Sequence, residues 1–351
     1  LDASAAAVAA RNDQTQYALT NGSTSSARGD TINVTFAAAD MHAIKQRRNL
    51  CTLGFNCHIR IGSVFADAFG NPSVTIPESG QAILVDELNR DTIGAALISF
   101  DLDLIADTMT FTFNEPVRAL ELDSTKITLR SSADVATSLN YELSGAARNS
   151  GLANDGLVSQ IYLELADVLA IKATLNLGTS VSDTFVTVVS GLVDDLEDND
   201  NLVIPNTEYQ LGPVQVTGYE TDTVPPTLVG FTAYDPTTGE IALSFNEPVD
   251  ISTFTVGEIT FHSTSAGIGS SHTLAEDELS IAYESVLDKM SIVFTIAQSD
   301  LRIISLDGAL AATQASTYIT FSSDMITDMS GAAVNPVSRE QVEIYGTVEE
   351  A

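Results

Sequence analysis

The sequence predicts an all-β protein made of tandem β-sandwich domains, each with about seven strands and one short helix. Three observations predict this fold class. Short alternating runs of Val, Ile, Leu and Thr are typical of strands that are buried on one face. An apolar fraction of 44% allows a buried core in each domain. The chain also repeats itself with a period of about 130 residues, which divides its 351 residues into domains.

The repeat is clearest in two nearly identical octapeptides, TFTFNEPV at 110–117 and ALSFNEPV at 242–249. Upstream of them, DTIGAALISF matches DTVPPTLVGF without a gap. Two later motifs occur three times, namely ADMHAIK, ADVLAIK and SDLRIIS, and an acidic turn that places Asp67, Asp195 and Asp328 in register. The alignment predicts an incomplete repeat at residues 1–90 and complete repeats at residues 91–221 and 222–351.

The first repeat lacks the counterpart of roughly residues 91–125, including the FNEPV strand. A sandwich without its first two strands would expose its core and its sheet edges, which favours aggregation. Two explanations remain open. Either the chain is a fragment cut from a longer one, or a strand from another chain fills the gap, as in donor-strand polymers.

Within the second repeat, each alternating run predicts one strand. Met109, Phe111 and Phe113 alternate with threonines, so one face of that strand should pack on a core. Between the fifth and sixth strands, Val168, Ile171 and Leu175 have helical spacing and predict a short helix over 166–175. In order, the predicted strands are 95–101, 108–114, 126–130, 139–145, 158–165, 183–191 and 214–220.

Seven alternating strands in about 130 residues are typical of an immunoglobulin-like β-sandwich, somewhat enlarged. The motif series DTVPPTLVGF, GEIALSFNEPVDISTFTVGEITF and a later V-x-D-x-x-G-N turn resembles the bacterial Ig-like repeats of S-layer and other large secreted surface proteins. It equally resembles tandem repeats of algal flagellar-hair (mastigoneme-like) proteins. The resemblance covers nearly the whole chain and implies an extracellular structural or adhesive protein without catalysis, located at the cell surface or in an appendage.

The charge balance restricts the partners. Forty-seven acidic and fifteen basic residues give a formal net charge of −32, which repels nucleic acid and anionic lipid headgroups. No apolar run approaches the roughly 20 residues that a membrane-spanning helix needs. We therefore expect no nucleic acid and no membrane insertion. Screening by salt or binding of divalent cations, both common outside cells, would make such a surplus tolerable.

Two covalent features are expected. Cys51 and Cys57 are the only cysteines, and their even count and close spacing predict a disulfide that closes a small loop. Two reduced thiols, or half of a metal site, are the alternatives. The tripeptides NGS at Asn21 and NVT at Asn33 are sequons, so these two residues are candidate N-glycosylation sites of a glycoprotein.

Acidic residues supply the candidate metal ligands. The stretch DDLEDNDN is dense in the hard oxygen donors that Ca²⁺ prefers, although it lacks the spacing of an EF-hand. Ca²⁺ is therefore a possible but not required cofactor, with a solvated acidic loop as the alternative. In FNEPV, the Pro should end a strand, and Asn and Glu should accept bonds from backbone amides. A calcium-binding role for Glu115 and Glu247 is the alternative there. The candidate ligands in the acidic stretch are Asp194, Asp195, Asp198 and Asp200.

No motif of a known catalytic class occurs in the sequence, which has no G-x-S-x-G, H-E-x-x-H or phosphate-binding G-x-x-x-x-G-K. We therefore expect a structural protein rather than an enzyme: a tandem Ig-like segment of a surface layer, fibre or flagellar-hair-like filament. Its partners would be copies of the same repeat in a homopolymer, and glycans are a further candidate. The alternative function is a cell-surface adhesin or carbohydrate-binding stalk, although the absence of Trp disfavours a glycan site.

Overall fold

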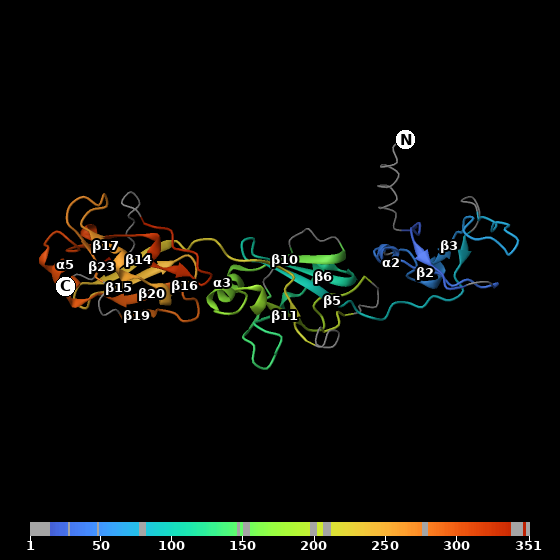
Figure 1. Ribbon diagram of the computed structural model, residues 1–351, viewed down its shortest axis with the longest axis horizontal. Helices are drawn as coiled ribbons and strands as arrows, with labels where there is room; N and C mark the ends of the chain where they lie inside the picture. The colour runs from blue at the N-terminus through green and yellow to red at the C-terminus, as the bar shows by residue number, and fades with distance from the viewer. Residues whose placement is uncertain are drawn as a thin grey trace, which may run out of the picture.

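The chain is rich in β-structure. In the part of the chain that is described, short strands predominate and three α-helices occur, so the predicted β-rich class is confirmed. Figure 1 shows the elements in three groups along the long axis, from the blue N-terminal group through a green one to an orange one. The computed structural model describes residues 15–26, 29–47, 49–76, 82–145, 148–149, 155–196, 202–205, 212–275, 280–337 and 347–348.

The first group contains two small antiparallel sheets and a helix. Strand β1 pairs with β2, and β3 pairs with β4. Among the described residues between 15 and 90, only Asp40 and Arg47 are buried, whereas Phe69 is 91% exposed. This group therefore has no apolar core within its described residues. Its elements are β1 (Gly22–Ser23), β2 (Thr35–Phe36), α2 (Ala38–Lys45), β3 (His58–Ile59) and β4 (Ile83–Leu84).

The second group has two sheets around one core. The strand orders are β13-β5-β6-β10-β9 and β12-β11-β7-β8, and both sheets contribute side chains to one cluster of buried apolar residues. Phe100 and Phe111 from one sheet and Ile127 and Val186 from the other are completely or almost completely buried. The elements are β5 (Leu97–Asp103), β6 (Thr108–Val117), β7 (Ile127–Arg130), β8 (Asn140–Glu142), β9 (Arg148–Asn149), β10 (Gly156–Tyr162), α3 (Leu165–Ala173), β11 (Phe185–Val188), β12 (Val214–Gln215) and β13 (Gly218–Glu220).

The third group repeats this plan. Its main strand orders are β19-β20-β15-β14-β23 and β18-β17-β21, and β16 pairs with β22 beside them. Its own buried cluster includes Phe261, Ile292 and Phe294. The elements are β14 (Leu228–Asp235), β15 (Glu240–Phe245), β16 (Val249–Asp250), β17 (Ile259–His262), β18 (Ser271–Thr273), β19 (Ser280–Tyr283), β20 (Ser291–Thr295), α5 (Gln298–Leu306), β21 (Tyr318–Phe321), β22 (Thr327–Asp328) and β23 (Thr347–Val348).

Equivalent hairpins in the two larger groups use the same turn chemistry. Asp103 ends β5 and accepts hydrogen bonds from the backbone amides of Ile105 and Ala106, at 2.9 and 2.8 Å. Asp235 ends β14 and accepts bonds from the Thr237 amide and the Thr238 hydroxyl in the same way. Single turns of 3₁₀-helix occur at Gly54–Asn56, Ala119–Glu121, Ser124–Lys126, Val181–Asp183, Ile251–Thr253, Val256–Glu258, Gln314–Ser316 and Ser323–Met325.

Several predicted elements have other bounds in the structure, such as the strand predicted over 183–191, which spans Phe185–Val188. The helix predicted over 166–175 spans Leu165–Ala173, because Thr174 is already extended and Asn176 has a positive φ of 62°. Leu175, expected on its buried face, is 51% exposed. The strand predicted over 214–220 is divided into β12 and β13, which belong to different sheets, and β13 pairs in parallel with β5.

Candidate functional site

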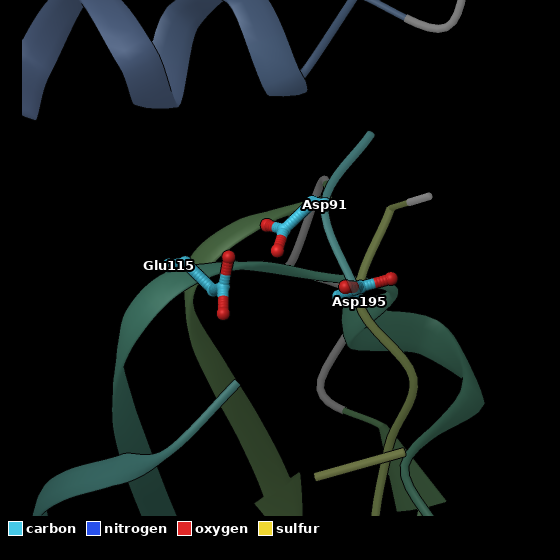
Figure 2. A group of neighbouring side chains, drawn as sticks. All are labelled: Asp91, Glu115 and Asp195. Carbon is cyan, nitrogen blue, oxygen red and sulfur yellow. The ribbon is translucent and has the colours of Figure 1, made fainter. Parts of the chain in front are cut away.

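A lysine–carboxylate contact joins α2 to the strands of the second group. Lys45 is the last residue of α2, and its ammonium donates hydrogen bonds to Asp91 and Glu115. Asp91 precedes β5, Glu115 lies in β6, and Asp195 follows β11. One carboxylate oxygen of each of these three acids lies within 4.8 Å of the others. Figure 2 shows the three carboxylates beneath the blue helix. Lys45 and the three acids are called the first junction below.

The same arrangement recurs between the second and third groups. The Nζ atom of Lys172, in α3, lies 2.8 Å from Oδ2 of Asp222 and 3.3 Å from Oε2 of Glu247. Asp328 completes the group, and all three acids are at least 96% buried. Lys172, Asp222, Glu247 and Asp328 are called the second junction.

The FNEPV strands hold the acids of both junctions in equivalent positions. Val117 forms an antiparallel bridge with Asp195, and Val249 pairs with Asp328 in the β16–β22 ladder. The valine of each FNEPV motif thus lies opposite the aspartate of the acidic turn. The glutamate two residues earlier then lies close to that aspartate.

The neighbouring asparagines have the predicted backbone role. Oδ1 of Asn114 accepts the Ala96 amide at 2.7 Å, and Oδ1 of Asn246 accepts the Thr227 amide at 2.6 Å. These bonds fix the segment before the first strand of each repeat against the FNEPV strand. The expectation that the glutamates also bond to backbone amides is corrected, because Glu115 and Glu247 accept from lysine ammonium groups instead.

At both junctions, burial and the lysine–carboxylate contacts shift the pKa values of the glutamate and the lysine in opposite directions. Burial raises the pKa of Glu115, and it raises the pKa of Glu247 to about 7, although the nearby lysine opposes the shift in each case. Burial disfavours the charged form of Lys45 and Lys172, but their bonds to carboxylates outweigh it and raise the pKa of both. Each lysine therefore stays protonated, and at the second junction Glu247 gains a proton at a pH close to neutral.

A second acidic feature recurs at each of the three helices in the described part of the chain. The aspartate of each ADMHAIK-type motif lies in the first turn of its helix and is buried. Asp40 accepts from the Tyr17 hydroxyl at 2.7 Å, and Asp167 accepts from the Tyr141 hydroxyl at 2.8 Å. In the third copy, Oδ1 of Asp300 lies 2.7 Å from Nε2 of His272. These residues tie each helix to the chain segment before it. We assign them a structural role.

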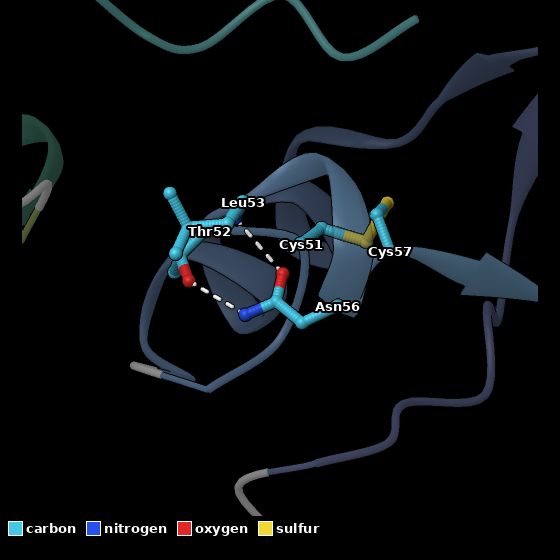
Figure 3. Close-up of a disulfide and its surroundings, with 5 residues drawn as sticks. All are labelled: Cys51, Thr52, Leu53, Asn56 and Cys57. Carbon is cyan, nitrogen blue, oxygen red and sulfur yellow. Dashed lines mark hydrogen bonds between the residues drawn. A yellow bond between two sulfur atoms is a disulfide. The ribbon is translucent and has the colours of Figure 1, made fainter. Parts of the chain in front are cut away.

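The predicted disulfide between Cys51 and Cys57 is present (Figure 3). It closes a loop in the first group. Inside the loop, Oδ1 of Asn56 accepts the Leu53 amide at 2.9 Å, and Nδ2 of Asn56 donates to the Thr52 hydroxyl at 2.8 Å. Both cysteines are therefore used, and neither is free to bind a metal.

The predicted metal ligands are only partly described. Asp195 does lie in an acidic group, but its neighbours there are Asp91 and Glu115, not the other aspartates of its own loop. Asp194 is half-buried and does not belong to that group. Asp198 and Asp200 lie outside the described residues.

The sequon residues Asn21 and Asn33 are both exposed. Oδ1 of Asn21 accepts the amide of Gly22 at 2.8 Å. Glycosylation of these residues stays a prediction.

Sequence reasoning missed the two junction lysines. The repeat alignment contains the observation that indicates these lysines. Lys45 and Lys172 occupy the same position of the ADMHAIK and ADVLAIK motifs, where the third copy has Ser305. Of the acids around them, the sequence indicates Asp195 and Asp328 as a repeated turn aspartate and Glu115 and Glu247 as candidate calcium ligands in FNEPV. Asp91 and Asp222 are visible only as the first residues of a repeated motif. What the alignment did not reveal is that the lysine and the acids of each junction meet at one place.

Among the described residues, no helix combines the length and the apolar character needed to cross a bilayer. Comparison of the sequence with protein-family models and with curated proteins finds no match.

Proposed function

We propose that this chain is a non-catalytic, extracellular structural segment of a surface layer, fibre or flagellar-hair-like filament, in which consecutive immunoglobulin-like domains form a stiff row. The observation that carries the proposal is the repeated junction. In both cases, a helix lysine of one repeat binds two carboxylates of the next. A contact that recurs at equivalent positions holds neighbouring domains in a defined orientation, as a load-carrying array requires.

The immunoglobulin-like assignment is supported by the shared strand order of the two larger groups. The antiparallel core β5-β6-β10 corresponds to β14-β15-β20, and a parallel strand lies at one edge in each case, β13 beside β5 and β23 beside β14. The opposite sheets correspond in the same way through β7-β11 and β17-β21. We propose domain boundaries at residues 91–221 and 222–351, after an incomplete domain at residues 1–90.

The extracellular location is supported by the disulfide, which persists in oxidising compartments. The exposed sequon residues Asn21 and Asn33 are compatible with glycosylation in a secretory pathway. The large negative charge disfavours nucleic acid as a partner. We propose that the partners are copies of the same repeat, in the same chain or in neighbouring chains.

The function is tested by electron microscopy of the native material. Regular polymers with a repeating domain along their length are expected. Dispersed monomers that bind immobilised glycans would contradict the proposal and would favour the adhesin.

The stiffness of the row is tested separately by small-angle X-ray scattering of the purified chain. Lys45→Met and Lys172→Met together should broaden the distribution of interatomic distances. The matched control is Lys126→Met, because the ammonium of Lys126 contacts Asp123 in an exposed ion pair inside one domain. Identical scattering of all the variants would show that the junctions do not stiffen the chain.

A further inference from the structure

The second junction contains three carboxylates that come from separate segments. Asp222 lies in the connection between β13 and β14, Glu247 lies between β15 and β16, and Asp328 is the last residue of β22. Their exposed fractions are 3%, 4% and 3%, and one oxygen of each lies within 4.8 Å of the others. The fold therefore assembles three buried acids at one point.

Two oxygens of this group have no hydrogen-bond partner among the described residues. Asp222 accepts the Val224 amide with Oδ1 and contacts Lys172 with Oδ2. Asp328 uses Oδ1 for two backbone amides, at 2.9 and 2.7 Å. Within the described part of the chain, Oδ2 of Asp328 and Oε1 of Glu247 are buried and have no donor. A buried carboxylate oxygen that has lost its water without gaining a donor is costly, so these two atoms point to a ligand.

The charge of the group indicates which ligand fits. Three carboxylates and one ammonium carry a net charge of −2 when all are ionised, and one divalent cation makes the sum zero. Lys172 uses Oδ2 of Asp222 and Oε2 of Glu247, whereas the two oxygens without partners lie on Glu247 and Asp328. The ammonium and a cation can therefore bind different oxygens of the same group.

We propose that Asp222, Glu247 and Asp328 bind one divalent cation of the Ca²⁺ type beside the ammonium of Lys172. All of these protein donors are hard carboxylate oxygens, the ligands that Ca²⁺ prefers, and Zn²⁺ would favour His or Cys. Three carboxylates cannot alone supply the six to eight oxygens of a Ca²⁺ shell, so water completes it. The dissociation constant should lie at about 10⁻⁴ to 10⁻³ M, as in extracellular calcium-binding modules.

The site is tested by isothermal titration calorimetry of the full chain with CaCl₂, after removal of metals with EDTA. Glu247→Gln and Asp328→Asn should each bind one equivalent of Ca²⁺ less than the wild-type chain. Counting relative to the wild type cancels any cation that binds elsewhere. Glu240→Gln is the matched control, because Glu240 lies in β15, is exposed and should leave the stoichiometry unchanged.

Thermal melting provides a second readout and a check of folding. In EDTA, both variants should melt close to the wild type or above it, since each removes a buried carboxylate with an unpartnered oxygen. Addition of 10 mM CaCl₂ should raise the Tm of the wild type and of Glu240→Gln more than that of the two site variants. MgCl₂, which demands a tighter octahedral shell, should have a smaller effect. Equal Ca²⁺ stoichiometry in all four proteins, or no uptake by the wild type, would overturn the proposal.

Discussion

The ammonium of Lys172 lies 2.8 Å from a carboxylate oxygen of Asp222, and the two residues belong to consecutive copies of the sequence repeat. The side chain of Lys172 is 13% exposed and that of Asp222 is 1% exposed, so the ion pair is largely shielded from water. Removal of one partner from such a pair leaves an uncompensated buried charge, which is more costly than the loss of a surface ion pair. The pair therefore couples the stability of the third group to a side chain of the second.

Lys172→Met should destabilise the chain by about 3 kcal/mol when unfolding by urea is followed in EDTA. Without the Lys172 ammonium, the buried carboxylates of Asp222 and Glu247 have lost the positive charge that they contact. Lys126→Met is the control, since its contact with Asp123 is 3.9 Å long and exposed, and should change the free energy of unfolding by less than about 1 kcal/mol. Equal effects of the two substitutions would mean that the buried pair adds nothing beyond a surface contact.

The pH dependence of stability should report Glu247. Its pKa in the folded chain is about 7, against an ordinary value of 4.5, because burial and the nearby Asp222 and Asp328 outweigh the attraction of Lys172. A raised folded pKa means that the folded state keeps a proton which the unfolded state has released. The contribution of Glu247 to stability is therefore full below about pH 4.5 and is lost as the pH rises through 7.

In EDTA, the urea midpoint of the wild type should thus fall between pH 5 and pH 8, and Glu247→Gln should show a smaller fall. Burial also raises the pKa of Glu115 and Asp328, and both groups remain in the variant, so the difference between the two profiles reports Glu247 together with its coupling to Asp328. Parallel profiles would refute the shift.

The β-strands could be predicted from the sequence because the alternation of apolar and polar residues is visible within each short segment. Met109, Phe111 and Phe113 alternate with threonines, and all three are at least 98% buried. The junctions could not be predicted in this way. Lys45 and Glu115 are 70 residues apart, and only the path of the chain brings the end of one helix to a strand of the next repeat.

Other differences have equally physical causes. Spacing alone included Leu175 in the helix, but Thr174 leaves the helical conformation and its hydroxyl bonds back to the Ala170 carbonyl. An alternating run also cannot reveal that a strand changes sheets. Val214 and Gln215 pair with β11, and the residues from Gly218 onward pair with β5.

Asp167→Asn should destabilise the second group by about 2 kcal/mol, because hydrogen bonds to a buried charged group are lost or weakened. Asp167 accepts from the Tyr141 hydroxyl and from the amide and hydroxyl of Ser144. Glu142→Gln, at an exposed position of the neighbouring strand β8, is the control and should stay within about 0.5 kcal/mol of the wild type. Urea unfolding measures both. A loss no larger than that of the control would remove the structural role assigned to the aspartate.

The disulfide should stabilise its own loop and not the two cores. Cys51 and Cys57 lie in a segment whose described residues include no buried apolar side chain, so reduction should leave the melting of the two larger groups unchanged. Limited proteolysis after reduction should instead cut faster between residues 48 and 58. Cys51→Ser with Cys57→Ser should show the same cleavage without reductant. Thiol alkylation of the unreduced, denatured chain should add no label, and labelling at both cysteines would show that the bond does not form.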